Sequence, residues 1–332
     1  MFNSVDTDFL LSATEGLYHR HIMSENGGLK VVVEADSLKS MPFIYADEDH
    51  LQLKDVNVKT LNLKGIRANK AFFHKVMTAQ LNADYISLRG ATLYQSILSN
   101  ASFVSSDLTD IVIEAALLQS SNFNNAILEG ANINMADLRW ADFTGCDLEG
   151  VVINNSQLYA AVLKGVNLGG ADLQGCIFSG DSDGSEADAD IKDVDFSGCI
   201  LNEADFARVI ADGAEFTWAE MFEVNFEEAK LVGADFTDAQ AGSGNFTHAD
   251  MQSAVFLGAS LEGANLEGAD CSKACFYEAK MAGAFLMNTN FTGADFTNAD
   301  LRGADFTGAN TTGANFTGAN IDDAIFDTVI AK

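Results

Sequence analysis

A five-residue rhythm of apolar and polar positions runs through most of this 332-residue chain. From Leu53 to Phe178, almost every fifth residue is large and apolar, and the residue two places before it is small or apolar, most often alanine. We call these the large and small core positions. In an extended segment, residues two apart point to the same side and the residues between them point to the other. The pattern therefore predicts an apolar interior and an exterior of asparagine, aspartate, threonine and glutamate.

A turn is predicted after each large core position. The residue two places further on, which we call the corner position, is most often glycine, with asparagine, glutamate or aspartate at some corners. These residue types favour tight turns. The residues directly before and after a large core position are the outward positions. Short extended pieces joined by such turns form a coil, and coils stacked about 4.8 Å apart let each backbone bond its neighbours on both sides.

A second period, of twenty residues, is visible in the aromatic side chains. Phenylalanine occupies positions 196, 216, 236, 256, 276, 296 and 316. Ten residues out of phase, a second column holds Phe206, Phe226, Phe246, Leu266, Leu286, Phe306 and Phe326. Two opposed aromatic columns, with slimmer columns between them, would fill a square core without voids. The spacing predicts four units per coil and about thirteen coils in all.

The units ADLRW, ADFTG, CDLEG, ANLEG, ADFTN and ADLRG resemble the A(D/N)Lxx unit of pentapeptide-repeat proteins, and the resemblance extends over residues 51–328. It implies an all-β fold, a right-handed quadrilateral β-helix with twenty residues per coil. It also implies a function in protein binding. Several pentapeptide-repeat proteins are acidic rods that resemble DNA in width and charge and bind type II topoisomerases such as DNA gyrase.

The repeats divide the chain into four segments. Residues 1–50 do not repeat, residues 51–180 form a first run, residues 181–190 interrupt it and shift its phase by three, and residues 191–328 form a second run. In the first segment, VDTDFLLSATEGLYHR has a helical spacing of apolar residues and LKVVVEA is strand-like. This segment is interpreted either as a small α/β cap on the first coil or as a targeting segment.

The interruption, within GDSDGSEADAD, is acidic. An EF-hand loop counted from Asp181 requires glycine at its sixth position and glutamate at its twelfth, where this chain has Glu186 and Lys192. We therefore expect a solvated loop that projects from one corner and binds no metal.

Charge is strongly negative and uneven. The formal net charge is −29, from 48 acidic and 19 basic side chains. Residues 181–240 alone hold 17 acidic and 3 basic side chains. We expect such a chain neither to bind nucleic acid directly nor to insert into a membrane, whereas a basic partner, or one that normally binds DNA, fits it. The alternative is that the acids only keep a long solenoid soluble.

Catalytic groups are scattered. The five histidines do not form a cluster, and Cys146, Cys176, Cys199 and Cys271 fall at core positions, where cysteine is a small apolar residue. Cys275 falls at an outward position, and a free exposed thiol favours a reducing compartment such as the cytoplasm. We expect no enzyme activity and no cofactor.

A binding site is expected at positions that face away from the core, and six outward or corner positions hold large aromatic residues: Trp140, Tyr159, Trp218, Phe222, Tyr277 and Phe285. Trp218 and Phe222 lie among glutamates in TWAEMFEVNFEE, which is typical of an interface hot spot, although Trp218 could instead shield backbone at a corner. Asp195, Glu215 and Asp235 lie twenty residues apart and form an acidic ladder, which ends at Val255. The predicted partner-binding residues are Asp195, Glu215, Trp218, Glu220, Phe222, Glu223, Glu227, Glu228 and Asp235.

Two hypotheses of function follow. In the first, the protein is a non-enzymatic acidic rod that imitates DNA and binds DNA gyrase or topoisomerase IV in the cytoplasm, protecting or modulating it. In the second, it is a secreted bacterial effector or adaptor, directed by residues 1–50, whose β-helix binds a protein partner, in a host cell for an effector. The last unit, DAIFDTVIAK, shows no capping helix, so it is either a terminal strand or the contact of an end-to-end homodimer.

Overall fold

The fold is that of a computed structural model. It describes the backbone of four short strands within residues 1–50, and whole residues over 51–163, 166–180, 189 and 191–326. The chain divides into two compact units. Residues 1–152 and 156–161 form the first, and residues 153–155 and 162–332 form the second.

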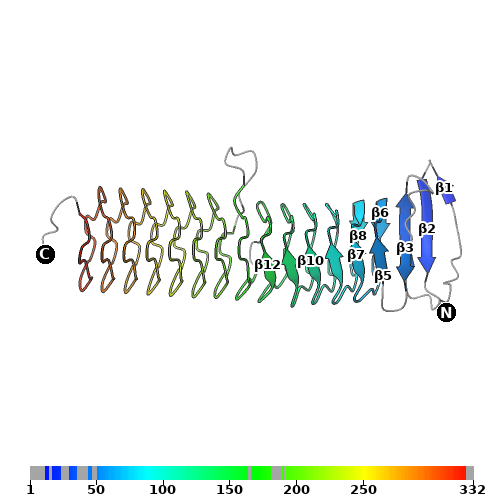
Figure 1. The fold of residues 1–332 in the computed structure, drawn as a ribbon, viewed down its shortest axis with the longest axis horizontal. Coiled ribbons are helices and arrows are strands. Elements are labelled where there is room, and N and C mark those ends of the chain that lie inside the picture. Colours follow the sequence, from blue (N-terminus) through cyan, green and yellow to red (C-terminus); the bar gives the residue numbers. More distant parts are fainter. Residues whose placement is uncertain are drawn as a thin grey trace. The chain divides into compact units, whose positions relative to one another are not determined.

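Parallel ladders with a twenty-residue register build the first unit, and its stacked coils are visible in Figure 1. One ladder follows the order β5, β7, β9, β10 and β11, while β6 pairs with β8. These strands are β5 (Leu51–Lys54), β6 (Asn57–Asn62), β7 (Phe72–His74), β8 (Met77–Asn82), β9 (Thr92–Tyr94), β10 (Val112–Glu114) and β11 (Asn132–Asn134). The last strand, β12 (Val152–Asn154), is divided between the units. Single parallel bridges continue the same register elsewhere, so the predicted all-β solenoid is confirmed.

Side-chain burial follows the five-residue rhythm in both units. Ala204 and Phe206 have no exposed surface, while Asp205 between them is half-buried. Corner positions have left-handed backbone, as in Gly233 with a φ of 68°. The next N–H then turns back to the large core position, so that Ala234 N donates a hydrogen bond to Leu231 O at 3.1 Å. Glycine is frequent at corners because it adopts this φ without steric cost.

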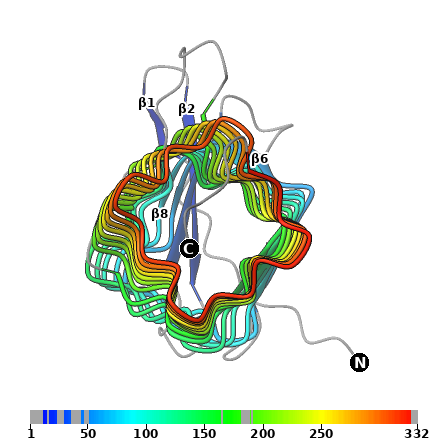
Figure 2. The same cartoon turned by 90° about the vertical axis from the view of Figure 1, so that its left-hand side faces the viewer.

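Phenylalanine rings fill the core of the second unit in the two predicted columns. Phe216 stacks on Phe196 and Phe236, with ring centroids 5.1 and 4.8 Å apart. Across the core, Phe216 meets Phe226 edge to face at 5.4 Å. The two columns therefore touch, and each coil of this unit has the four-sided outline seen along its length in Figure 2.

The acidic interruption is an insertion of eight residues in the second unit. Ladder partners are twenty residues apart elsewhere, but Asn167 lies opposite Asp195, twenty-eight residues on. Ala189 N donates to Phe178 O at 3.1 Å, which is the bond that residue 181 would make in an unbroken run. Residues 181–188 are thus the added ones, which accounts for the phase shift of three. They and Asp190 lie outside the described residues, so the expectation of a solvated, metal-free loop stays a prediction.

The predicted N-terminal helix is wrong where the structure describes it. β1 (Ser12–Thr14) pairs antiparallel with β2 (Leu17–Met23), which pairs with β3 (Lys30–Ala35), the strand expected from LKVVVEA. β3 pairs with β6, and β4 (Ile44–Ala46) pairs with β5, both antiparallel. Unpaired edges of the first coil offer hydrogen bonds that a short isolated helix, marginal in water, cannot match. Residues 5–11, 15 and 16 of the predicted helix lie outside the described residues.

Candidate protein-binding surface

An acidic ladder runs along one face of the second unit. Asp195, Glu215 and Asp235 occupy the same outward position on successive coils and lie opposite one another in parallel bridges. Val255 comes next, so the acidic run covers three coils. Twenty-residue spacing predicted both the ladder and its end.

Two of these carboxylates also hold the backbone. Asp195 Oδ1 accepts a hydrogen bond from Ser197 N, and Asp235 Oδ1 accepts one from Thr237 N, each at 2.8 Å. Glu215, whose side chain is one methylene longer, is exposed. Two acidic side chains of the ladder therefore also hydrogen-bond to the backbone of their own units.

Trp218 stands at the corner between this face and the next. Its φ is 56°, and its N–H donates to Thr237 O at 2.9 Å. The indole Nε1 donates to Asp238 Oδ2 at 3.2 Å, while 66% of the residue is exposed. The corner N–H is already bonded and the ring is accessible, so the ring is available for contact with a partner. Its geometry favours an anchor for a partner.

Phe222 lies on the next face and borders a hollow. Its N–H donates to Asn202 Oδ1 at 2.7 Å, and 51% of the residue is exposed. The same outward position one coil further on is Gly242, and a Cβ added there would lie 3.6 Å from Phe222 Cδ2. The Phe222 ring thus lies beside a glycine, which leaves space there. The hollow, of about 580 Å³, is also lined by Glu220, Gln240, Ser243, Ser260 and Glu262.

Exposed glutamates surround the two aromatic residues. Glu215 precedes Trp218, and Glu220 lies between Trp218 and Phe222. Both are exposed, and so is Glu223. Glu223 follows at a left-handed corner with a φ of 56°. These five side chains belong to one coil and two adjoining faces, and we call them the 218/222 surface.

Glu227 and Glu228 do not belong to the 218/222 surface. They follow Phe226, whose ring meets that of Phe216 across the core. Their face is therefore opposite the face of the acidic ladder. The structure brings part of the predicted site together and separates the rest, because one flat partner cannot contact Glu227 and the acidic ladder at once.

Three supporting residues were missed from the sequence. Asn202 binds the Phe222 N–H, Gly242 leaves space for the ring, and Asp238 binds the Trp218 indole. The twenty-residue period places Asn202, Phe222 and Gly242 in one ladder. A glycine at an outward position, next to an aromatic residue, was the signal that would have found them.

Tyr159 is buried, contrary to its prediction as an outward aromatic. Only 7% of it is exposed, because Arg139 and Trp140 lie against it. The Arg139 guanidinium carbon is 5.3 Å from the Tyr159 ring centroid, and the Trp140 ring meets it edge to face at 5.6 Å. Trp140 and Phe285 are exposed, at 40% and 49%, and Tyr277 is half-buried.

Cysteines lie where the five-residue pattern placed them. Cys146, Cys176, Cys199 and Cys271 are buried, and Cys275 is partly exposed. Burial raises the pKa of the Cys146 thiol to about 11 and that of Cys199 to about 12, so both are protonated and poorly nucleophilic at neutral pH.

Two other kinds of site were sought in the described part of the chain. No three of its histidine, cysteine, aspartate and glutamate side chains group in a way that could hold a metal ion. None of its segments is a helix of the length and apolar character needed to cross a membrane.

The class of protein is thus a parallel β-solenoid built from four five-residue units per coil. Two family models match this chain. The model of a pentapeptide repeat region matches residues 189–266, and the model of eight pentapeptide repeats matches residues 106–150, 141–180, 269–308 and 299–329. Together they cover more than half of the sequence, and the chain belongs to the pentapeptide-repeat family.

Solved structures of similar proteins share little sequence with this chain. QnrB1, a plasmid-mediated fluoroquinolone resistance protein, is 18% identical, with 55% of this chain and 87% of QnrB1 covered and a TM-score of 0.37. HetL, a pentapeptide repeat protein involved in heterocyst differentiation regulation in the cyanobacterium Nostoc, is 22% identical, with coverages of 86% and 93% and a TM-score of 0.22. A pentapeptide repeat protein from the Arabidopsis thaliana thylakoid lumen is 29% identical, with coverages of 37% and 69% and a TM-score of 0.19. A search of curated protein sequences gave no match.

Proposed function

We propose that the protein is a non-enzymatic binding scaffold of the cytoplasm, and that its 218/222 surface binds a positively charged site on a partner protein. The observation that carries the proposal is the exposed pair Trp218 and Phe222 among three exposed glutamates. Large, rigid aromatic side chains dominate the binding energy of many interfaces, and surrounding charge steers the partner and selects it. The bond from the Trp218 indole to Asp238 orients that ring before binding, and the bond from the Phe222 N–H to Asn202 fixes the backbone that carries the second ring.

The partner we propose is a DNA-binding protein, with a type II topoisomerase such as DNA gyrase or topoisomerase IV as the first to test. Residues 191–240 hold 12 acidic and 3 basic side chains. Their two and a half coils span roughly 12 Å. Duplex DNA of that length presents about seven phosphates. The density of negative charge is therefore comparable with that of DNA, although the acids are shared among four faces, and several pentapeptide-repeat proteins bind type II topoisomerases.

Two charge reversals of equal size test this proposal. Glu220→Lys/Glu223→Lys alters the 218/222 surface, whereas Glu227→Lys/Glu228→Lys alters exposed glutamates that lie past Phe226 and serves as the matched control. We expect the first pair to weaken binding to purified gyrase by about tenfold or more, and the control by much less. Binding should also weaken with added salt. The measurement is biolayer interferometry, together with the supercoiling and quinolone-induced cleavage reactions of gyrase.

Two results would contradict the proposal. Equal losses for both variants would show that net charge, rather than the 218/222 surface, governs binding. Unchanged supercoiling and cleavage with micromolar wild-type protein would exclude gyrase as the partner.

The effector hypothesis rests on residues 1–50. Within that segment β3 and β4 pair with strands of the first coil, which supports the cap interpretation of these two strands. Delivery by residues 1–50 stays a prediction, and fusion of this segment to a secreted reporter tests it. The end-to-end homodimer also stays a prediction, since residues 327–332 lie outside the described residues.

A further inference from the structure

A second exposed surface, on the first unit, is apolar rather than acidic. Met77, Ile97 and Leu117 occupy the same outward position on three successive coils and lie opposite one another in parallel bridges. They are 41%, 37% and 38% exposed. In residues 51–152, none of the other three ladders of this position has two apolar residues in succession. We call these three residues the apolar stripe.

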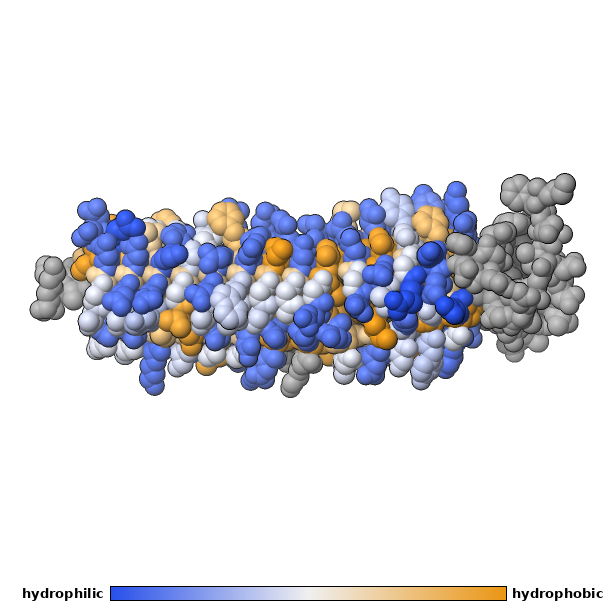
Figure 3. All heavy atoms as spheres, turned by 90° about the horizontal axis from the view of Figure 1, so that it is seen from below, coloured by the Kyte–Doolittle hydropathy of each residue, from blue (hydrophilic) through white to orange (hydrophobic). Residues whose placement is uncertain are grey.

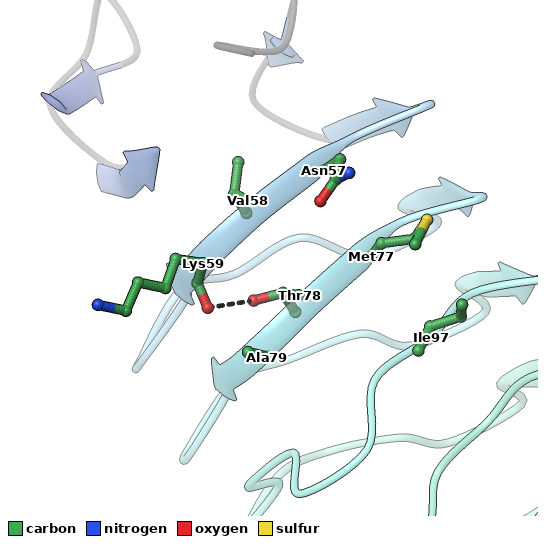
Figure 4. Close-up of a pocket in the computed structure, with 7 residues that line it drawn as sticks. All are labelled: Asn57, Val58, Lys59, Met77, Thr78, Ala79 and Ile97. Atoms are coloured by element: carbon green, nitrogen blue, oxygen red, sulfur yellow. Dashed lines mark hydrogen bonds between the residues drawn. The ribbon is translucent and has the colours of Figure 1, made fainter. Parts of the chain in front are cut away.

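Beside the apolar stripe the surface is low. The outward positions that follow Met77 and Ile97 across the large core position are Ala79 and Ser99, both small. A hollow of about 440 Å³ lies here, and Figure 4 shows Met77, Ile97 and Ala79 on neighbouring coils around it. Figure 3 shows apolar side chains scattered among hydrophilic ones on one side of the molecule. Met77 and Ile97 of the apolar stripe thus line this hollow, which lies at the Lys59 end of the stripe.

Backbone groups of the apolar stripe are already bonded within the solenoid. Ile97 N donates to Val76 O at 2.7 Å, and Ile97 O accepts from Thr78 N at 3.1 Å. Leu117 N donates to Ser96 O at 2.8 Å. A partner cannot add a β-strand here, so its contact must be made by side chains.

An aromatic and cationic cluster closes one end of the apolar stripe. Asp137 follows Leu117 in the ladder. Arg139 Nε and Nη2 donate to the two carboxylate oxygens of Asp137 at 2.7 and 2.6 Å. The guanidinium carbon lies 5.3 Å from the ring centroids of both Trp140 and Tyr159. Trp140 is therefore an exposed aromatic side chain held in place by its neighbours.

We propose that this surface docks an amphipathic α-helix of a partner protein, with acidic residues along the edges of its apolar face. One helical turn advances 5.4 Å and one coil of the solenoid about 4.8 Å, so apolar residues at helix positions i, i+4 and i+7 meet Met77, Ile97 and Leu117 in turn. About ten helical residues reach from Met77 to Trp140.

The charges around the apolar stripe determine which residues are expected along the edges of the partner helix. Exposed Lys59 and Lys75 lie near one end of the apolar stripe, and Arg139 lies at the other. Asp137 and Arg139 form an ion pair and cancel. Near the stripe this leaves Lys54, Lys59 and Lys75 against Glu114 on the preceding face and the exposed Asp55, which lies at the same corner as Lys75 one coil earlier, a balance of one positive charge. The surround is net positive in a protein of net charge −29, which favours acidic flanks on the helix. This surface differs in chemistry from the 218/222 surface, so the inference does not rest on the proposed function.

Selection from a phage-displayed library of single helices, with the full-length protein as bait, tests the inference. We expect enrichment of helices with apolar residues at i, i+4 and i+7 and with glutamate or aspartate beside them. Synthetic copies of the enriched helices are then titrated by fluorescence anisotropy against Ile97→Asp. Aspartate is common at outward positions of this chain and caps the turn that follows, so this variant keeps the fold.

Ile127→Asp is the matched control. Ile127 occupies the same type of outward position, is 53% exposed, and lies between Asp107 and Asp147 in a different ladder. We expect Ile97→Asp to weaken binding about tenfold or more and Ile127→Asp to leave it within about twofold. Enrichment of no helix, of helices without acidic flanks, or of helices equally sensitive to both substitutions would overturn the inference.

Discussion

Two glycines in one coil of the second unit lie two residues apart and have different functions. Gly242 is at an outward position, where a Cβ would find its nearest neighbour, Phe222 Cδ2, at an ordinary 3.6 Å. Gly244 is at a small core position, where most units have alanine. A Cβ there would lie 2.9 Å from Phe246 Cε2 and 3.2 Å from Val224 Cγ1. Gly244 therefore compensates for the Phe246 ring and for the Ala241 carbonyl oxygen, which a Cβ would approach to 3.0 Å, and in part for Val224, which fills the same position one coil earlier.

Substitution of these residues tests that compensation. We expect Gly244→Ala to lower the free energy of unfolding by about 1–3 kcal/mol, as overpacking of a filled core does, and Gly242→Ala to leave it almost unchanged. Adding Val224→Ala to Gly244→Ala should recover part of the loss, because it removes one of the three close contacts and leaves those with Phe246 and Ala241. Urea denaturation of the three variants measures this. A Gly244→Ala protein as stable as wild type would show that the core adjusts without cost.

Residue-scale predictions succeeded where the five-residue period decides the outcome. The period placed Cys199 and Phe216 inside and Glu215 outside without knowledge of neighbours. It failed for Tyr159, because an outward position can still be covered by long side chains of the adjacent coil. It also missed Gly242, because the hollow depends on what stands twenty residues away rather than on the local phrase.

At the scale of elements, the ladders tolerate interruption when the added residues leave the coil. Asn167 and Asp195 pair across the eight-residue insertion, and Asp195 then pairs with Glu215 in the ordinary register. The sequence revealed the break as a shift in phase, but only the bond from Ala189 N to Phe178 O shows which residues are extra. In the N-terminal strands, by contrast, the sequence pattern was misleading. Helical spacing in residues 5–20 gave no sign that this stretch supplies β1 and part of β2, whose partners are each other and the expected strand β3.

Deletion of residues 181–188 tests the insertion. The deletion joins Gly180 to Ala189 and gives the phrase FSGADI, a regular unit with alanine at the small core position. We expect the shortened protein to fold with an unchanged β-type circular dichroism spectrum and an equal or higher thermal midpoint, because closing the longer loop costs entropy. Deletion of residues 182–189 is the control. It removes the same number of residues but loses Ala189, and it should lower the midpoint.

At the scale of the whole molecule, the two units differ in net charge. Residues 51–161 hold 10 acidic and 8 basic side chains, whereas residues 191–326 hold 22 and 6. Each coil of a solenoid depends mainly on its neighbours, so repulsion among acids in one unit weakens that unit rather than the whole chain. The few ion pairs described in the second unit, such as Arg302 with Asp300 at 2.6 Å, offset little of this charge.

Salt should therefore stabilise the second unit selectively. Raising the ionic strength from about 0.02 M to about 0.5 M shortens the Debye length from over 20 Å to about 4 Å, which screens repulsion between acids on neighbouring coils. We expect backbone amides of residues 191–326 to exchange more slowly at the higher salt, with little change in residues 51–161. Hydrogen exchange followed by mass spectrometry resolves the two units in one experiment. Equal protection of both units by salt would show that the excess of acids is not a source of strain in the second unit, and the acidic surface would then carry no cost in stability.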